Sequence, residues 1–250
     1  MNRVLVIGER CDDIFIYGDT PRLSPEGPAP VFIPTREVYN GGMGENVMNN
    51  LLSLKIDVDF EHQKSPITKT RHIHESSNTL LLRIDEDGNT DNIGDRLPKI
   101  DFWEYQMVVI SDYNKGFLSE EDIAYIAYKH PNTICDTKKK LGDWCKDLRF
   151  IKLNRTEFNN NKEFIEENDW ILEKLIITLD KDGCMYNGTS YPTEEVEIMD
   201  ISGAGDTFVA GFVKMFLDTE DIPKSIQYAN RCSAQVVQKR GVTTIDYENL

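Results

Sequence analysis

The sequence lacks long apolar runs, paired cysteines and an excess of basic residues. No stretch approaches the roughly 20 apolar residues that cross a bilayer, and the N-terminus carries no apolar secretion segment, so we expect neither membrane insertion nor export. Five scattered cysteines, with no CxxC pair or Cys/His cluster, predict reduced thiols in a cytoplasmic protein and no zinc site. A net charge of −15 argues against nucleic acid as a partner.

What is present is a chain of 250 residues with alternating strand-like and helical patterns. Short apolar runs that end in polar residues predict buried strands at Val4–Ile7, Met107–Ile110, Thr133–Cys135, Phe150–Leu153 and Leu175–Thr178. Helical spacing of apolar residues predicts helices at 43–54, 119–130, 206–217 and 226–237. This order predicts an α/β fold with a mainly parallel sheet covered by helices on both faces. Ligands of such sheets bind at the carboxyl ends of the strands.

Two segments do not fit the strand–helix alternation. Residues 14–33 are rich in proline and glycine, and residues 68–85 alternate so that Leu80, Leu82 and Ile84 share one face. We interpret them as a small β-flap, or lid, over one end of the sheet. The expected organisation is one domain over residues 1–250, with lid segments at about 14–36 and 68–85.

The most informative motif is the segment Asp200–Thr207, in which a glycine turn runs directly into an amphipathic helix. Free N–H groups at a helix N-terminus form an anion site, and Gly203 and Gly205 let the backbone approach the anion closely. A carboxylate at that terminus, Asp206, could take a proton from an attacking hydroxyl, a combination that suits phosphoryl transfer to an alcohol. The alternative is that Asp206 only stabilises the first turn of the helix. The sequence contains neither a GxxxxGK[ST] phosphate loop nor a complete dinucleotide fingerprint.

Two further motifs are weaker. The segment Asn40–Asn46 places a double glycine before a helix, where it could pack against a polyol and hydrogen-bond it, or simply form a capped turn. Asn154 and Glu157 follow a strand and could organise metal-bound waters near phosphates. The alternative for this pair is a capping box at the start of a helix.

Together these motifs resemble the PfkB, or ribokinase-like, family of carbohydrate kinases. One branch of that family, the D-glycero-D-manno-heptose 7-phosphate kinases of lipopolysaccharide-precursor synthesis, is similar over nearly the whole chain. The segments that carry this second similarity are Arg3–Gly8, Tyr17–Gly18, Leu23–Val31, Thr68–Arg71, Leu82–Asp85 and Ser111–Gly116. The resemblance implies transfer of the γ-phosphoryl group of Mg-ATP to a hydroxyl of a sugar phosphate, giving heptose 1,7-bisphosphate in that branch.

The resemblance also implies roles for individual residues. Asp206 would be the catalytic base, with Gly203, Ala204 and Gly205 as the anion hole. Sugar-binding positions would be Asp13, Gly41, Gly42 and Asn46, and the cations Lys69, Arg71 and Lys115 would hold the phosphate of the substrate or be ordinary surface residues. The ATP site would comprise Asn154, Glu157, Thr178, Gly183, Asn230 and Gly241. Glu157 would bind magnesium through water, and Asp200 is a candidate potassium ligand.

The chain departs from the family in three places. Only residues 55–67 connect Leu54 to Thr68, where the family has an additional strand–helix unit, so a sheet edge would be exposed and could pair with a second copy. Ile14 replaces a residue that is basic in the heptose branch, and 230–232 carries larger side chains than relatives do. No nucleotidyltransferase segment follows Leu250, so we expect the kinase step alone. The alternatives are a family kinase for another sugar or a nucleoside, or a catalytically idle sugar- or nucleotide-binding relative.

Overall fold

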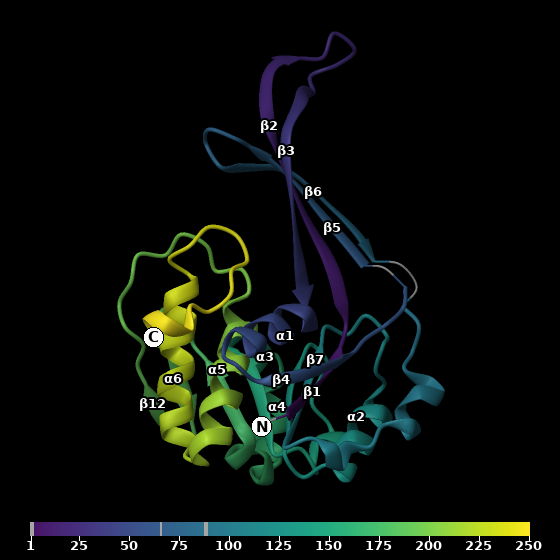
Figure 1. Ribbon diagram of the computed structural model, residues 1–250, viewed down its shortest axis with the longest axis vertical. Helices are drawn as coiled ribbons and strands as arrows, with labels where there is room; N and C mark the ends of the chain where they lie inside the picture. The colour runs from purple at the N-terminus through teal and green to yellow at the C-terminus, as the bar shows by residue number, and fades with distance from the viewer. Residues whose placement is uncertain (1–2, 66, 88–89) are drawn as a thin grey trace.

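The computed structural model describes residues 3–65, 67–87 and 90–250, which form an α/β body and a projecting lid (Figure 1). The strands are β1 (Arg3–Gly8), β2 (Arg10–Leu23), β3 (Pro30–Met43), β4 (Asp57–Glu61), β5 (Ile67–His74), β6 (Thr79–Asp87), β7 (Met107–Asp112), β8 (Thr133–Thr137), β9 (Phe150–Asn154), β10 (Leu175–Thr178), β11 (Cys184–Tyr186) and β12 (Thr189–Tyr191). The α-helices are α1 (Gly44–Ser53), α2 (Glu120–Lys129), α3 (Arg155–Asn160), α4 (Lys162–Glu167), α5 (Ala204–Thr219) and α6 (Ile222–Val236).

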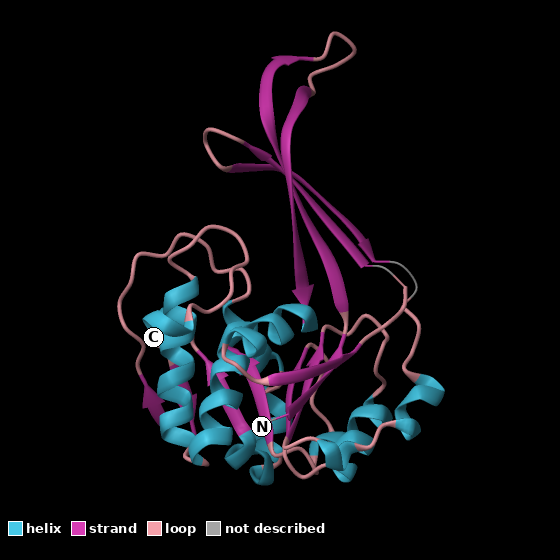
Figure 2. Cartoon of the chain, viewed as in Figure 1, coloured by secondary structure: helices cyan, strands magenta, loops and turns pink. Residues whose placement is uncertain are grey.

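The body is built on a sheet with the strand order β12-β11-β10-β9-β8-β7-β1-β4. The strands from β4 to β10 in this order are parallel, and β11 and β12 are antiparallel additions at one edge. All five strands and all four helices predicted from the sequence are present, within a few residues of the expected bounds. The mainly parallel sheet with helices on both faces is therefore confirmed (Figure 2).

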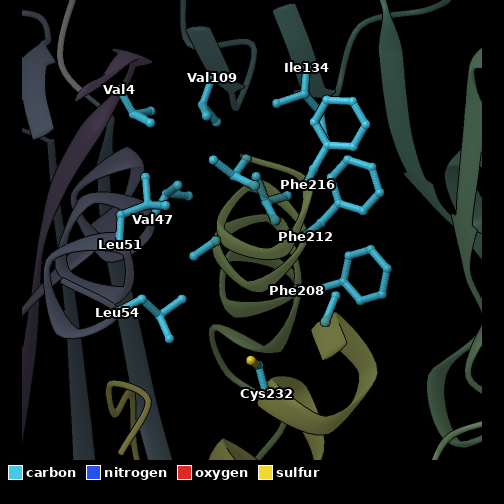
Figure 3. Packing of buried hydrophobic residues seen from close by; sticks show 14 of the residues in the cluster. Val4, Val47, Leu51, Leu54, Val109, Ile134, Phe208, Phe212, Phe216 and Cys232 are labelled. Carbon is cyan, nitrogen blue, oxygen red and sulfur yellow. The ribbon is translucent and has the colours of Figure 1, made fainter. Parts of the chain in front are cut away.

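Successive residues of the central strands point to opposite faces of the sheet and belong to two separate hydrophobic cores. Because both faces are covered, these strands are apolar throughout. Val4, Val109 and Ile134 point to one face, where they pack against α1 and α5 (Figure 3). On that face Phe212 is fully buried, stacked on Phe216 with ring centroids 5.7 Å apart. The opposite face packs against α2 and the short helices around it. Ser119 and Asp122 form a capping box that starts α2.

The lid is a four-stranded sheet with the order β3-β2-β5-β6, and it rises away from the body in Figure 1. Its strands are longer than the segments 14–36 and 68–85, because β2 begins directly after β1 and β3 runs directly into α1. The proline- and glycine-rich stretch at residues 24–29 forms the turn between β2 and β3. The lid is therefore anchored at its base to the end of β1 and to the start of α1.

The shortened connection after α1 forms β4, which pairs in parallel with β1, and then leads into the lid strand β5. Among the described residues β4 is the last strand on this side of the sheet, so the exposed edge expected from the sequence is present.

Candidate active site

The N-terminus of α5 carries the main motif and is shaped by its preceding turn. Gly203 adopts a left-handed conformation with φ 78°, and a Cβ at this position would lie 2.5 Å from the side-chain nitrogen of Asn46, so only glycine fits. Asp200 closes the turn, since its carboxylate accepts hydrogen bonds from the backbone N–H groups of Ser202 at 2.9 Å and Gly241 at 3.0 Å. The structure thus joins two predicted site residues, Asp200 and Gly241, that are 41 residues apart in the sequence.

Asp206 lies in the first turn of α5 and is 6% exposed. Asn46 donates a hydrogen bond to its Oδ2 at 2.9 Å, and the hydroxyl of Tyr113 donates one to its Oδ1 at 2.9 Å. Burial raises the pKa of Asp206 to about 6; the nearby carboxylate of Asp136 adds to this, whereas the two hydrogen bonds and Lys152 oppose it. A carboxyl group with a pKa near 6 is ionised at neutral pH yet basic enough to accept a proton in a transition state.

Both hydrogen-bond donors are held in place by their own neighbours. The side chain of Asn50 donates to the backbone oxygen of Asn46 at 2.8 Å and to its Oδ1 at 3.1 Å, which orients the amide so that its nitrogen faces Asp206. Burial also raises the pKa of Tyr113, so this phenol keeps the proton that it donates. The arrangement of Asn46, Tyr113 and Asp206 is therefore fixed from three different elements of the chain.

A cavity of about 610 Å³ opens beside Asp206, along the carboxyl ends of β8, β9 and β10. The predicted residues that line it are Asn154, Thr178, Gly183, Gly203, Ala204, Gly205, Asp206 and Asn230. Its size and its position at the strand ends suit a small-molecule ligand. Gly241 lies outside this cavity and lines a second one of about 360 Å³, between the lid and the C-terminal segment.

The large cavity contains charged residues that the sequence argument did not include. Lys152 is 3% exposed, and its Nζ lies 2.9 Å from Oδ2 of Asp136; the same Nζ would be 2.9 Å from a Cβ at Gly205. Lys138 also lines the cavity and is ion-paired with Glu157. Asp136 directly follows a predicted strand, so the rule that ligands bind at strand ends could have identified it.

Asn154 and Glu157 form a reciprocal capping box at the start of α3. Each side chain accepts a hydrogen bond from the backbone N–H of the other at 2.8 Å. The capping alternative for this pair is therefore confirmed. Glu157 is not among the described residues that line the cavity, but its Oε1 is ion-paired with Lys138, which does line it.

The lid residues predicted to bind the acceptor share the inner side of the lid base. Asp13 pairs in register with Asn40 and Lys69 on the flanking strands. Asp13 is ion-paired with Arg71 at 2.7 Å, and the Lys69 ammonium lies 5.6 Å from the centre of the Tyr113 ring.

The glycines Gly41 and Gly42 leave room for neighbouring carboxylates. A Cβ at Gly42 would lie 2.7 Å from Asp13, and one at Gly41 would lie 2.3 Å from Glu45. Lys115 belongs to the loop after β7, where its backbone N–H binds Glu9 at 3.0 Å. The lid base and the helix start therefore bring the predicted sugar-binding positions to one side of Asp206.

Among the described residues no group of three or more His, Cys, Asp or Glu side chains is arranged to hold a metal. A magnesium ion bound mainly by phosphates and water needs only one or two carboxylates, and Asp136 offers a buried Oδ1 with no hydrogen-bond partner. Both oxygens of Asp200 already accept N–H groups, so potassium binding there stays a prediction. None of the helices described here is long and apolar enough to cross a membrane.

A buried carboxylate at a helix N-terminus, beside a cavity at the strand ends, matches the arrangement expected above for phosphoryl transfer to an alcohol. Residues 115–249 match the model of the pfkB family of carbohydrate kinases, and the chain belongs to that family. It is 29% identical over 306 aligned positions to the bifunctional protein HldE of Helicobacter pylori, a match that covers 100% of this chain and 66% of the relative. The chain thus spans slightly less than two thirds of the length of that relative. The alignment is longer than the chain, so the relative contains additional residues in the matched region.

Solved structures show the same fold. Ribokinase from Thermotoga maritima superposes with a TM-score of 0.74 at 13% identity, covering 99% of this chain and 98% of that one. Phosphofructokinase-2 from Escherichia coli, solved in complex with potassium, superposes with a TM-score of 0.75 at 13% identity, covering 100% of this chain and 97% of that one. The fold is therefore ribokinase-like, and the protein is a carbohydrate kinase by family.

Proposed function

We propose that this protein transfers the γ-phosphoryl group of ATP to a hydroxyl of a sugar phosphate, with Asp206 as the base. The observation that carries the proposal is the buried Asp206 carboxylate, with a pKa near 6, at the N-terminus of α5. A base is needed there because the attacking hydroxyl must lose its proton as the new phosphate ester forms. The N–H groups of Gly203 and Gly205 would supply donors for the charge that develops on the transferred group, whereas the N–H of Ala204 donates to the backbone oxygen of Ile201 at 3.2 Å and would have to give up that bond to contribute.

ATP would occupy the 610 Å³ cavity, with its phosphates toward Asp206. Lys138, Lys152 and Lys181 line this cavity, with Lys152 next to Gly205, and they would compensate phosphate charge in a protein that is acidic overall. Magnesium would be held through water by Glu157 and by Oδ1 of Asp136, which accepts no hydrogen bond and lies 4.0 Å from Nζ of Lys138. When bound, the ion would neutralise charge on the phosphates. Thr178, Gly183 and Asn230 would line the rest of the nucleotide site, with Gly241 supporting its loop through Asp200.

The acceptor would lie between the lid base and Asp206, where Asp13, Gly41, Gly42 and Asn46 are found. We propose a phosphorylated sugar, with Lys69, Arg71 and Lys115 as the cations on this side of the site. The similarity to HldE favours heptose 7-phosphate as the acceptor and heptose 1,7-bisphosphate as the product. Arg71 is proposed to bind the phosphate of the acceptor and Asp13 its sugar, and these two side chains form an ion pair with each other. Binding of the acceptor would therefore use two groups that already stabilise each other.

The test is a coupled ADP-release assay with Mg-ATP and D-glycero-D-manno-heptose 7-phosphate, with and without potassium. Asp206→Asn is the matched control, and we expect it to retain ATP binding while kcat falls about 10²–10⁴-fold, the scale of a lost general base. A panel of other sugars, sugar phosphates and nucleosides identifies the acceptor if heptose 7-phosphate is not used. ATP or sugar binding by calorimetry, with no turnover of any acceptor, would instead favour the idle relative.

The cations of the acceptor side have their own test. We expect Lys69→Ala and Arg71→Ala to raise KM for the phosphorylated sugar about tenfold or more, since hydrogen bonds to charged groups contribute about 1.5–3 kcal/mol. KM for ATP should not change. If neither substitution alters KM for the sugar phosphate, these residues do not bind its phosphate.

We also propose that the lid pairs with the lid of a second copy. Leu80, Leu81, Leu82 and Ile84 lie along β6 and are 52%, 40%, 53% and 42% exposed, and a register shift opposite His72 and Ile73 interrupts their alternation between the two faces of the lid. Apolar side chains in a row on an edge strand favour burial against another chain. Light scattering of the wild type and of Leu82→Lys measures the oligomeric state; a monomeric wild type contradicts this pairing.

A further inference from the structure

The carboxylate of Glu9 has no place in the proposed chemistry, yet it is completely buried next to the site. Glu9 lies between β1 and β2, and its carboxylate points into the loop that follows β7. It accepts hydrogen bonds from the backbone N–H groups of Tyr113 at 2.8 Å, Lys115 at 3.0 Å and Phe117 at 3.3 Å. Both carboxylate oxygens act as acceptors, so the loop is wrapped around a side-chain anion.

The backbone of this loop has the conformation expected of an anion-binding turn. Asn114 and Gly116 have φ values of 56° and 101°, so their left-handed conformations alternate with ordinary ones. Such alternation makes successive N–H groups converge on one point. Asp112, at the end of β7, accepts a further hydrogen bond from the N–H of Asn114 at 3.2 Å. A Cβ at Gly116 would meet no atom within 4 Å, so the constraint at this position is conformational rather than steric.

Glu9 is connected to both hydrogen-bond donors of Asp206. Its carboxylate holds the backbone of Tyr113, whose hydroxyl binds Asp206. Its backbone oxygen accepts a 2.8 Å hydrogen bond from the N–H of Gly44, the first residue of α1, which carries Asn46. One residue therefore links the end of β1 to the two segments that set the environment of the base.

We propose that Glu9 is a positioning residue for phosphoryl transfer, whose buried carboxylate folds the loop at residues 113–117 and so holds the Tyr113 hydroxyl on Asp206. This inference rests on the proposed role of Asp206 as the base. Replacing Glu9 by glutamine turns one acceptor oxygen into an NH₂ group that faces N–H donors. The loop can then no longer satisfy all three N–H groups, and Tyr113 loses its fixed position.

Other charged and titratable groups lie near the carboxylates of Asp206 and Glu9, and their pKa values could also change in a Glu9 variant. Asp206 is influenced by Tyr113, Asp136 and Lys152. Glu9 is close to Asp112, which adds to the effect of burial in raising the pKa of Glu9, whereas the three backbone hydrogen bonds oppose it. Asp112 is in turn bound by Lys139 at 2.7 Å and by the hydroxyl of Thr137.

The experiment measures the pKa of the Asp206 carboxyl directly, by ¹³C NMR titration of labelled protein, in Glu9→Gln, Tyr113→Phe and the double variant. Loss of a hydrogen bond to a carboxylate corresponds to an upward shift of about 1–2 pKa units. We expect Glu9→Gln to shift the pKa of Asp206 in the same direction as Tyr113→Phe. The double variant should shift it no further than the larger single change, because both remove the same contact.

Two other variants keep the test decisive. Glu166→Gln makes the same chemical change on α4, where the exposed Glu166 is ion-paired with Lys162, and should leave Asp206 unaffected. If Glu9→Gln does not fold, Gly116→Ala strains the loop from its other side without a clash and should shift the pKa of Asp206 upward as well. An unchanged pKa of Asp206 in a folded Glu9 or Gly116 variant, or additive shifts in the double variant, would overturn the inference.

The NMR measurement separates this inference from the proposed function. Failure of the wild type to phosphorylate any acceptor would reject the kinase proposal, but the titration would still show whether Glu9 controls the hydrogen bond between Tyr113 and Asp206. If the enzyme is active, the acid limb of its pH–kcat profile should move with the NMR pKa in each variant.

Discussion

Removing the Tyr113 hydroxyl should change the pH at which the enzyme works. In Tyr113→Phe, Asp206 keeps its hydrogen bond from Asn46 and its burial, but loses one donor at 2.9 Å. A hydrogen bond to a charged group is worth about 1.5–3 kcal/mol, which at about 1.4 kcal/mol per unit is a shift of roughly 1–2 pKa units. The hydrogen bond favours the ionised form, so its loss raises the pKa of Asp206 from about 6 into the range of about 7–8.

The consequence is a pH-dependent loss of activity. With a pKa of about 6, roughly nine tenths of Asp206 is ionised at pH 7, whereas a pKa of about 7.5 leaves roughly one quarter ionised. We therefore expect kcat/KM of Tyr113→Phe to fall about fourfold at pH 7, to fall by about 15-fold at pH 6, and to approach the wild-type value near pH 9.

The assay is kcat/KM against pH from 5 to 9 for the wild type and Tyr113→Phe, with the coupling enzymes in excess at every pH. The wild type should lose activity below about pH 6, with a slope of one. An equal loss at every pH would mean that Tyr113 contributes packing or substrate contact rather than tuning of the base. If the acid limb of the pH profile lies at the same pH in Tyr113→Phe as in the wild type, the assignment of the pKa to Asp206 is refuted.

Three further predictions concern stability and geometry. Asp206→Asn should melt no lower than the wild type at pH 7–8, because a buried carboxyl with a raised folded pKa makes the native state less stable as pH rises from about 4 to 6; calorimetry at pH 4 and 8 checks the sign. Gly203→Ala should lower kcat about tenfold or more, since its Cβ would displace the Asn46 amide from Asp206, while ATP binding persists. Phe212→Ala should reduce the free energy of unfolding by about 3–5 kcal/mol in urea titrations, with m unchanged.

The fold could be predicted from the sequence wherever the local hydrophobic pattern and the tertiary packing favour the same secondary structure. The strands around Val4–Ile7 and Met107–Ile110 are apolar because both faces of the sheet are covered, and α5 is apolar because it packs under the sheet. The lid was predicted as a β-structure, but its length was underestimated. Its strands continue into the body at Arg10 and Met43, although glycines flank both points.

The site was predictable as far as its residues belong to one motif or one strand end. Gly203 to Asp206 are consecutive, and their helix start can be recognised from spacing. Tyr113 and Lys152 reach Asp206 and Gly205 only through the folding of distant strands, since 93 residues separate Tyr113 from Asp206. A tyrosine in a loop and a lysine within an apolar strand carry no local signal of such contacts. Glu9 also carries no local signal of its contacts, because its three hydrogen-bond partners lie more than 100 residues away in the sequence.

The position of the shortened connection after α1 indicates which kinetic constant it should affect. The residues proposed for catalysis and nucleotide binding come from α1, α3, α5, α6, the loop after β7, the ends of β8, β9 and β10, and the loops that contain Gly183 and Gly241. β4 and the connection at 62–65 contribute none of them, and β4 sits beyond β1 on the side away from β8–β10. Side chains at the start of the connection, moreover, support the lid base: the Gln63 amide exchanges hydrogen bonds with the backbone of Arg10 at 2.9 and 2.5 Å. We therefore expect the absence of a strand–helix unit at this edge to affect the lid, and so KM for the acceptor more than kcat.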